Sequence, residues 1–105
     1  MMIKITVLLP TCYNDLTQIP QSVLSNLILD LDDITDGHTF GGHVSGTYRM
    51  DNEDMVTDRC GVFWVVCDMK LLPQLRDWAA NCAKVLRQES IYFEVQQVQV
   101  EFIRA

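Results

Sequence analysis

The sequence predicts an α+β fold in which a four-stranded antiparallel sheet carries two helices on one face. Segments with strand-like and helix-like periodicity alternate in the order β-α-β-β-α-β. Neither a repeat nor a low-complexity tract interrupts them. The simplest solution for this order is a ferredoxin-like two-layer sandwich. We expect the sheet order 4-1-3-2, which makes the first and third strands central.

The first strand and the first helix follow directly from residue patterns. IKITVLL, residues 3–9, is rich in β-branched residues and stops at Pro10. One face of this strand carries Ile3, Ile5, Val7 and Leu9, and the other carries Lys4, Thr6 and Leu8. Pro20 suits the first turn of a helix, and Gly37 is the expected stop. The apolar stripe of this helix is Val23, Leu24, Leu27, Ile28, Leu31 and Ile34.

The middle of the sequence predicts a hairpin. HVSGTYRM, residues 43–50, is the second strand, and the acidic segment 51–58 is its turn, with Met55 and Val56 starting the third strand. CGVFWVVCDM, residues 60–69, is the clearest strand of all. Its two faces are both apolar: Phe63, Val65 and Cys67 on one, and Val62, Trp64 and Val66 on the other. We therefore expect this strand to be central and covered on both sides.

The last third predicts a helix and a long strand. The helix begins near Leu71, with Pro73 in its first turn and Asp68 as its cap. Its buried stripe is Leu75, Trp78, Ala79, Cys82, Val85 and Leu86. In SIYFEVQQVQVEFIRA the apolar phase slips by one residue at Gln96–Gln97. We expect either a β-bulge there or pairing of the second half with another subunit.

The second face of the sheet predicts self-association. Two helices cover one side only, and the other side combines Val62, Trp64 and Val66 with Lys4, Thr6, Leu8, Tyr92, Glu94 and Gln96. A sheet face of this composition is seldom left in water. We expect a homodimer or a higher homo-oligomer, or the wall of a ligand pocket, and a protein partner fits the same surface.

Length and charge limit the classes of function. The 105 residues predict one domain, residues 1–105, with 14 acidic against eight basic side chains and a net charge of −6. No lysine or arginine lies between Ile5 and Tyr48. Direct nucleic-acid binding is disfavoured because it needs a basic footprint. No segment reads as a membrane span, and Pro10 interrupts a signal-peptide pattern, so we expect a cytoplasmic protein.

The four cysteines do not form a recognisable motif. Cys12, Cys60, Cys67 and Cys82 contain no CxxC pair and no zinc-like spacing. We expect reduced structural thiols rather than disulfides or nucleophiles. The sequence also lacks GxGxxG, a P-loop, HExxH and GxSxG. It predicts no cofactor.

The stretch ITDGHTFGGHVSGTYRMD, residues 34–51, holds four of the five glycines and both histidines. As metal ligands, His38 and His43 would need a third group such as Asp36, Asp51 or Cys60. We expect no metal. The glycines, Gly41 and Gly42 among them, are interpreted as a helix stop, a turn and a flexible strand edge. The residues left as ligand-binding candidates are His43, Tyr48, Arg49 and Trp64.

From about Gly37 to Val95 the sequence resembles a group of small bacterial and phage-type proteins that share a domain of unknown function. The matching features are Thr39, Gly41 and Gly42, Tyr48, the GVFWVV strand, and Gln88–Glu89 before SIYFEV. A tryptophan often stands at the place of Tyr48 in that pattern, which is a departure. The resemblance implies a ferredoxin-like fold and no established activity, so no catalytic residue is carried over.

Three functions are compatible with the sequence. The first is a self-associating binding module for a small ligand or a protein. The second is a cofactor-free enzyme of the dimeric α+β barrel type, such as an isomerase or oxygenase, that uses His43, Tyr48, Arg49 and Trp64. The third is a phage-style inhibitor whose acidic residues mimic nucleic acid. A pocket lined by His43, Tyr48 and Trp64 would favour the enzyme, and one acidic stripe would favour the mimic.

Overall fold

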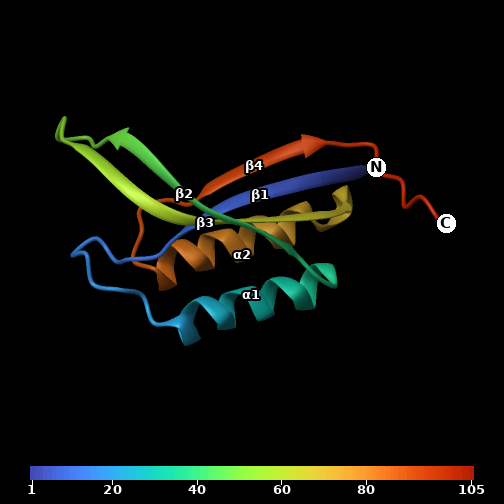
Figure 1. Ribbon diagram of the computed structural model, residues 1–105, viewed down its shortest axis with the longest axis horizontal. Coiled ribbons are helices and arrows are strands. Elements are labelled where there is room, and N and C mark those ends of the chain that lie inside the picture. Colours follow the sequence, from blue (N-terminus) through green and yellow to red (C-terminus); the bar gives the residue numbers. More distant parts are fainter.

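The computed structural model describes residues 1–105 and has the predicted α+β architecture (Figure 1). Its elements are β1 (Met2–Pro10), α1 (Gln21–Thr35), β2 (Thr39–Arg49), β3 (Met55–Asp68), a 3₁₀ turn (Met69–Leu71), α2 (Leu72–Val85) and β4 (Tyr92–Gln97). The sheet order is β2-β3-β1-β4, with every neighbouring pair antiparallel. This confirms both the expected order and the central position of the first and third strands.

Both helices pack on one face of the sheet (Figure 1). On β1, the residues predicted for one face, Ile3, Ile5, Val7 and Leu9, are at most 2% exposed and belong to the core. Val65 and Cys67 of β3 are buried with them. Residues of the alternate set, such as Leu8, Trp64 and Val66, are only half-buried. The expectation that β3 is covered on both sides is therefore wrong for the single chain, because no second layer lies over this open face.

The helix boundaries differ slightly from the expected ones. α1 ends at Thr35, and Asp36, at φ 64°, takes the left-handed cap position that was expected of Gly37. The Asp68 side chain does cap, since it accepts a hydrogen bond from Lys70 N–H at 2.8 Å. A 3₁₀ turn separates this cap from α2. Five of the six residues in the predicted α2 stripe are buried, whereas Val85 is 39% exposed because it lies on the outer side of the last turn.

Gly41 and Gly42 lie inside β2, so their interpretation as a turn before the strand is wrong. The pairing passes from Phe40–Phe63 to His43–Gly61, which leaves one extra residue in β2 and forms a β-bulge. Gly42 has φ 92°, a conformation that glycine adopts without strain. A Cβ atom at Gly41 would overlap the Trp64 ring. Both glycines thus serve the bulge and its contact with β3.

The last strand is much shorter than predicted. β4 ends at Gln97, where the apolar phase slips, and residues 98–105 form no regular element. The reason is the absence of a partner: β1 begins at Met2, whose carbonyl accepts the final sheet bond, from Val98 N–H at 3.2 Å. Past that point the chain offers no neighbouring strand.

No helix in the structure combines the length and the apolar character that a membrane crossing requires. The cytoplasmic location stays a prediction.

Candidate functional site

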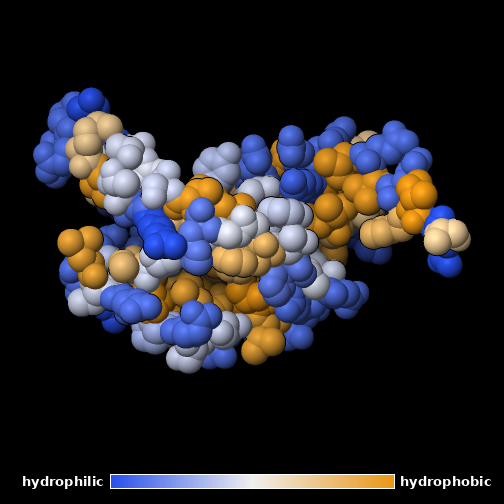
Figure 2. Space-filling model, in the orientation of Figure 1, coloured by the Kyte–Doolittle hydropathy of each residue, from blue (hydrophilic) through white to orange (hydrophobic).

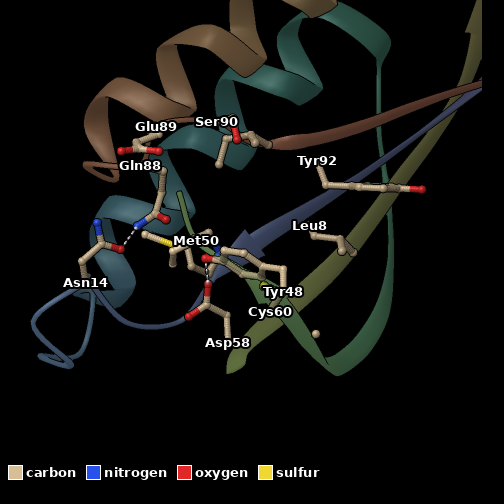
Figure 3. A pocket seen from close by; sticks show the side chains of 13 residues that line it. Leu8, Asn14, Tyr48, Met50, Asp58, Cys60, Gln88, Glu89, Ser90 and Tyr92 are labelled. Carbon is tan, nitrogen blue, oxygen red and sulfur yellow. Dashed lines mark hydrogen bonds between the residues drawn. The ribbon is translucent and has the colours of Figure 1, made fainter. Parts of the chain in front are cut away.

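A pocket of about 410 Å³ lies at the hairpin end of the open sheet face. Four parts of the chain form it, as Figure 3 shows: the end of β1, the β1–α1 loop, the β2–β3 hairpin, and the connection from α2 with the start of β4. The lining residues are Leu8, Pro10, Asn14, Gly46, Tyr48, Met50, Asp58, Cys60, Gln88, Glu89, Ser90, Ile91 and Tyr92. This volume is within the range of small-molecule sites.

The strand registers explain why these residues meet. Leu8 of β1 pairs with Tyr92 of β4, and both side chains point to the open face. In the hairpin, Tyr48 pairs with Val56 and Gly46 with Asp58, so Tyr48 and Asp58 are diagonal neighbours on that same face. The hairpin curves away from the helices (Figure 1). Figure 2 shows a hollow between the hairpin and the body of the molecule.

Tyr48 and Asp58 form the clearest polar contact in the pocket. The Tyr48 hydroxyl donates a hydrogen bond to Oδ2 of Asp58 at 2.7 Å (Figure 3). This bond, together with partial burial and the negative charge of Asp58, raises the pKa of Tyr48 to about 12. At neutral pH the phenol is therefore protonated and fixed in direction by the carboxylate.

The remaining polar groups come from the two loops. Nε2 of Gln88 donates to Oδ1 of Asn14 at 3.3 Å, and Nδ2 of Asn14 donates to the carbonyl of Arg87 at 3.3 Å. These bonds tie the β1–α1 loop to the α2–β4 connection, next to Glu89. The lining includes two carboxylates, Asp58 and Glu89, and no lysine or arginine. The pocket is thus electronegative and unsuited to phosphate.

Cys60 also borders the pocket, but its chemistry is that of a protonated thiol. Burial, and then the nearby negative charge of Asp58, raises the pKa of Cys60 above its ordinary value. A nucleophilic cysteine needs a lowered pKa. All four cysteines are free.

The four candidate residues from the sequence do not converge on one pocket. Tyr48 lines the pocket described above, whereas His43 pairs with Gly61 on the helix side and borders a second, more open depression with Cys12 and Arg59. Arg49 lies at the hairpin tip, where Nη1 is 3.5 Å from Oε2 of Glu53. Their role in ligand binding stays a prediction.

Trp64, the fourth candidate, lies on the open face but does not line the pocket. The Lys4 ammonium stands 4.7 Å from the centre of its ring, which makes a cation–π contact between neighbouring central strands. Trp64 therefore contacts Lys4 of the neighbouring strand within the sheet.

The histidines make other contacts. Nδ1 of His38 lies 2.7 Å from Oδ1 of Asp32, which joins the start of β2 to α1. His43 packs edge-on against Phe40 with ring centres 5.3 Å apart. The structure contains no group of three or more His, Cys, Asp or Glu side chains arranged to hold a metal ion.

Sequence reasoning missed Asp58, Glu89 and Asn14 as pocket residues. Asp58 could have been found only with the hairpin register, since its closeness to Tyr48 depends on which residues of β2 and β3 are paired. Gln88 and Glu89 appeared only as part of a family-like motif. Asn14 carried no signal, because it reaches the pocket through a long-range contact with Gln88.

Neither a protein-family model nor a curated protein sequence matches the chain. Solved structures do resemble it. The divalent cation tolerance protein CutA1 of Thermus thermophilus has 10% identity and a TM-score of 0.71, covering 97% of this chain and 88% of that one. The periplasmic divalent cation tolerance protein CutA of Archaeoglobus fulgidus has 7% identity and a TM-score of 0.72, with 97% and 88% covered.

A phage SAM lyase in complex with S-methyl-5'-thioadenosine has 12% identity and a TM-score of 0.69, covering 91% of this chain and 81% of that one. At such identities the likeness establishes the fold alone. These small proteins share the two-layer arrangement described above, and none of their residues is transferred to this chain.

Proposed function

We propose that the chain is a self-associating binding protein whose open-face pocket takes a small cationic ligand with a flat ring system. The lining of the pocket is the observation that carries this proposal. The pocket is lined by the rings of Tyr48 and Tyr92 and by the carboxylates of Asp58 and Glu89, and its lining contains no basic side chain. A cation gains both from the carboxylates and from the aromatic faces.

S-adenosylmethionine (SAM) is the first ligand to test. It combines a flat adenine ring with a positively charged sulfonium and an ammonium group. A phage SAM lyase of the same fold is in complex with S-methyl-5'-thioadenosine, a neutral thioether with the same ring. Comparing the affinities for SAM and for S-methyl-5'-thioadenosine therefore separates recognition of the ring from recognition of the charge.

Titration calorimetry tests the proposal. We expect SAM to bind, and Asp58→Asn and Glu89→Gln each to weaken it about tenfold, the size of one charge-assisted hydrogen bond. The affinity for S-methyl-5'-thioadenosine should change less, because it carries no charge. The matched control is Glu94→Gln, which removes a carboxylate from the open face outside the pocket. No binding of SAM, or an equal loss in the control, would contradict the proposal.

Self-association is supported by the exposed apolar residues of the open face. Val44 is 42% exposed, Tyr48 44% and Tyr92 55%, and all three lie on the side that no helix covers. A surface of this kind is commonly buried against another chain. Light scattering should return a multiple of 12.0 kDa; a monomer at that mass would contradict this part.

A second candidate is a cofactor-free enzyme that acts on the ligand in the same pocket. The hydrogen bond between Tyr48 and Asp58 favours it, because the carboxylate holds the phenol proton and orients the hydroxyl oxygen, whose lone pairs can accept a hydrogen bond from the ligand. Chromatography of SAM incubated with the protein distinguishes the two. Conversion to S-methyl-5'-thioadenosine that Tyr48→Phe slows would favour the enzyme; binding without conversion would favour the binding protein.

The acidic mimic receives no such support. Asp30, Asp32 and Asp33 belong to α1, whereas Asp51, Glu53 and Asp54 belong to the hairpin turn. Figure 1 places the turn at the end of the molecule opposite to the end of α1. The acidic residues thus form two groups rather than one stripe.

A further inference from the structure

The hairpin contains an unpaired stretch of sheet edge. The pairing of β1 with β3 stops at Pro10–Cys60, whereas β3 begins at Met55. Residues 55–58 therefore pair with β2 on one side and with no strand on the other. We name this stretch, Met55–Asp58, the free edge.

The direction of its backbone groups follows from Arg59. The carbonyl of Arg59 accepts a hydrogen bond from Thr11 N–H at 3.0 Å, so Arg59 faces the side of β1. Backbone groups alternate along an antiparallel strand, and Thr57 and Met55 therefore face the same side. Outside the strand ladders, neither residue takes part in a backbone hydrogen bond. The free edge thus presents unused donors and acceptors, which readily accept another strand.

Residues 98–105 are a strand-like segment without a partner. Val98, Val100 and Phe102 alternate with polar residues, as in a strand with one apolar face. Beyond Val98 the segment makes no backbone hydrogen bond. Phe102 and Ile103 are 88% and 84% exposed, and Figure 2 shows apolar surface at this end of the molecule.

The segment cannot reach the free edge of its own chain. It leaves the sheet at the end of the molecule opposite to the hairpin (Figure 1). The long axis measures 49 Å, whereas eight extended residues span roughly 26 Å. Any pairing between the two must therefore join different copies.

We propose that residues 98–104 of one copy pair as a β-strand with the free edge, Met55–Asp58, of a second copy. The contact is head-to-tail, so its repetition closes a ring of identical subunits if the rotation between copies closes, and extends a filament if it does not. Because Asp58 and Tyr48 of the hairpin also line the pocket, the incoming strand borders the pocket and narrows its mouth. This inference rests on the proposed self-association and makes the ligand site a shared one.

Phe102→Asp tests the segment. The side chain is almost fully exposed in the single chain, so the fold should be unchanged, and we expect the mass from light scattering to fall. The matched control is Leu29→Asp, an exposed apolar residue on α1, which should keep the wild-type mass. A wild-type mass for Phe102→Asp would overturn the inference.

Thr57→Pro tests the free edge, because proline lacks the N–H that the incoming strand would use. Thr57→Ala keeps that group and is the control. Circular dichroism checks that both variants fold. Thr57→Pro should lose the assembly, and Thr57→Ala should retain it; retention by both would overturn the inference.

Mixing the two defective variants is the sharpest test. Phe102→Asp keeps an intact free edge, and Thr57→Pro keeps an intact segment. One copy of each should therefore form a head-to-tail dimer, with twice the mass of a single chain. If the assembly instead joins identical surfaces of two copies, mixing the variants would not restore it. Absence of the dimer in the mixture would therefore overturn the head-to-tail arrangement.

Ligand binding separates this inference from the proposed function. If the pocket is shared, Phe102→Asp should weaken SAM about tenfold although residue 102 is far from the pocket of its own chain. Unchanged affinity would overturn the shared site. If wild-type protein binds no SAM, the proposed ligand fails, and the mass measurements still decide the assembly.

Discussion

The two faces of the sheet use the same strands for different purposes. On the helix side, Ile5 and Val65 are 2% and 4% exposed and pair directly with one another. On the open side, their neighbours Thr6 and Trp64 also form a pair but are only half-buried. Alternation along each strand therefore gives the two faces different contents: one face holds the core, and the other holds the pocket.

The largest expected difference between the faces comes from one charge placed on either side of β3. In Val65→Asp the carboxylate would be buried in the core without a partner, which costs about 5 kcal/mol or more and is enough to unfold many domains. In Val66→Asp it reaches solvent, and we expect a loss of about 1–2 kcal/mol. Urea unfolding followed by circular dichroism measures both; equal losses would contradict the division.

A similar pair on α2 compares its inner and outer sides. Leu75 is fully buried and Val85 is 39% exposed. Leu75→Ala should lower the free energy of unfolding by about 3 kcal/mol, through lost burial and a cavity, and Val85→Ala by less than about 1 kcal/mol. Thermal and urea unfolding both report the difference. A large loss for Val85→Ala would restore the expectation that this residue belongs to the core.

Glycine-to-alanine substitutions in the bulge of β2 should lower the free energy of unfolding by intermediate amounts, which urea unfolding measures. Gly41→Ala places a Cβ against the Trp64 ring and should cost about 2 kcal/mol, because the ring must move. Gly42→Ala meets no atom but strains φ at 92°, which should cost about 1 kcal/mol. Gly46→Ala, with neither problem, is the control and should change stability by less than about 0.5 kcal/mol.

The smallest expected effect is the pH dependence of the contact on the open face. The pKa of Tyr48 is raised to about 12 in the folded chain, above its ordinary value of 10. The resulting stability is complete below pH 10 and is lost as pH rises toward 12. Because Tyr48 is 44% exposed, solvent screening limits it to about 0.5–1 kcal/mol.

Urea unfolding at pH 8 and pH 11.5 should show this extra loss in wild-type protein and not in Tyr48→Phe. The ultraviolet titration of the tyrosines provides the second measurement. A component near pH 12 should be present in wild-type protein and missing from Tyr48→Phe. Its persistence in the variant would assign the raised pKa to another tyrosine.

The sequence predicted the element order, the sheet order and the buried face of β1 because these depend on local periodicity. The same method failed at Gly41–Gly42, since a bulge within a strand and a turn before it use the same residues. It failed again at residues 98–105, whose alternation is that of a strand but which have no neighbour in the chain. Periodicity reports what a segment can form, whereas pairing requires a partner.

For the candidate site the division is similar. Tyr48 could be selected from the sequence, as an aromatic residue on a hairpin strand beside the central strand. Its association with Asp58, Glu89 and Asn14 required the tertiary structure, because the pairing register and the Asn14–Gln88 contact across 74 positions bring these residues together. Local side-chain chemistry thus determined the two faces of the sheet. Only long-range packing decided which polar groups meet on the open one.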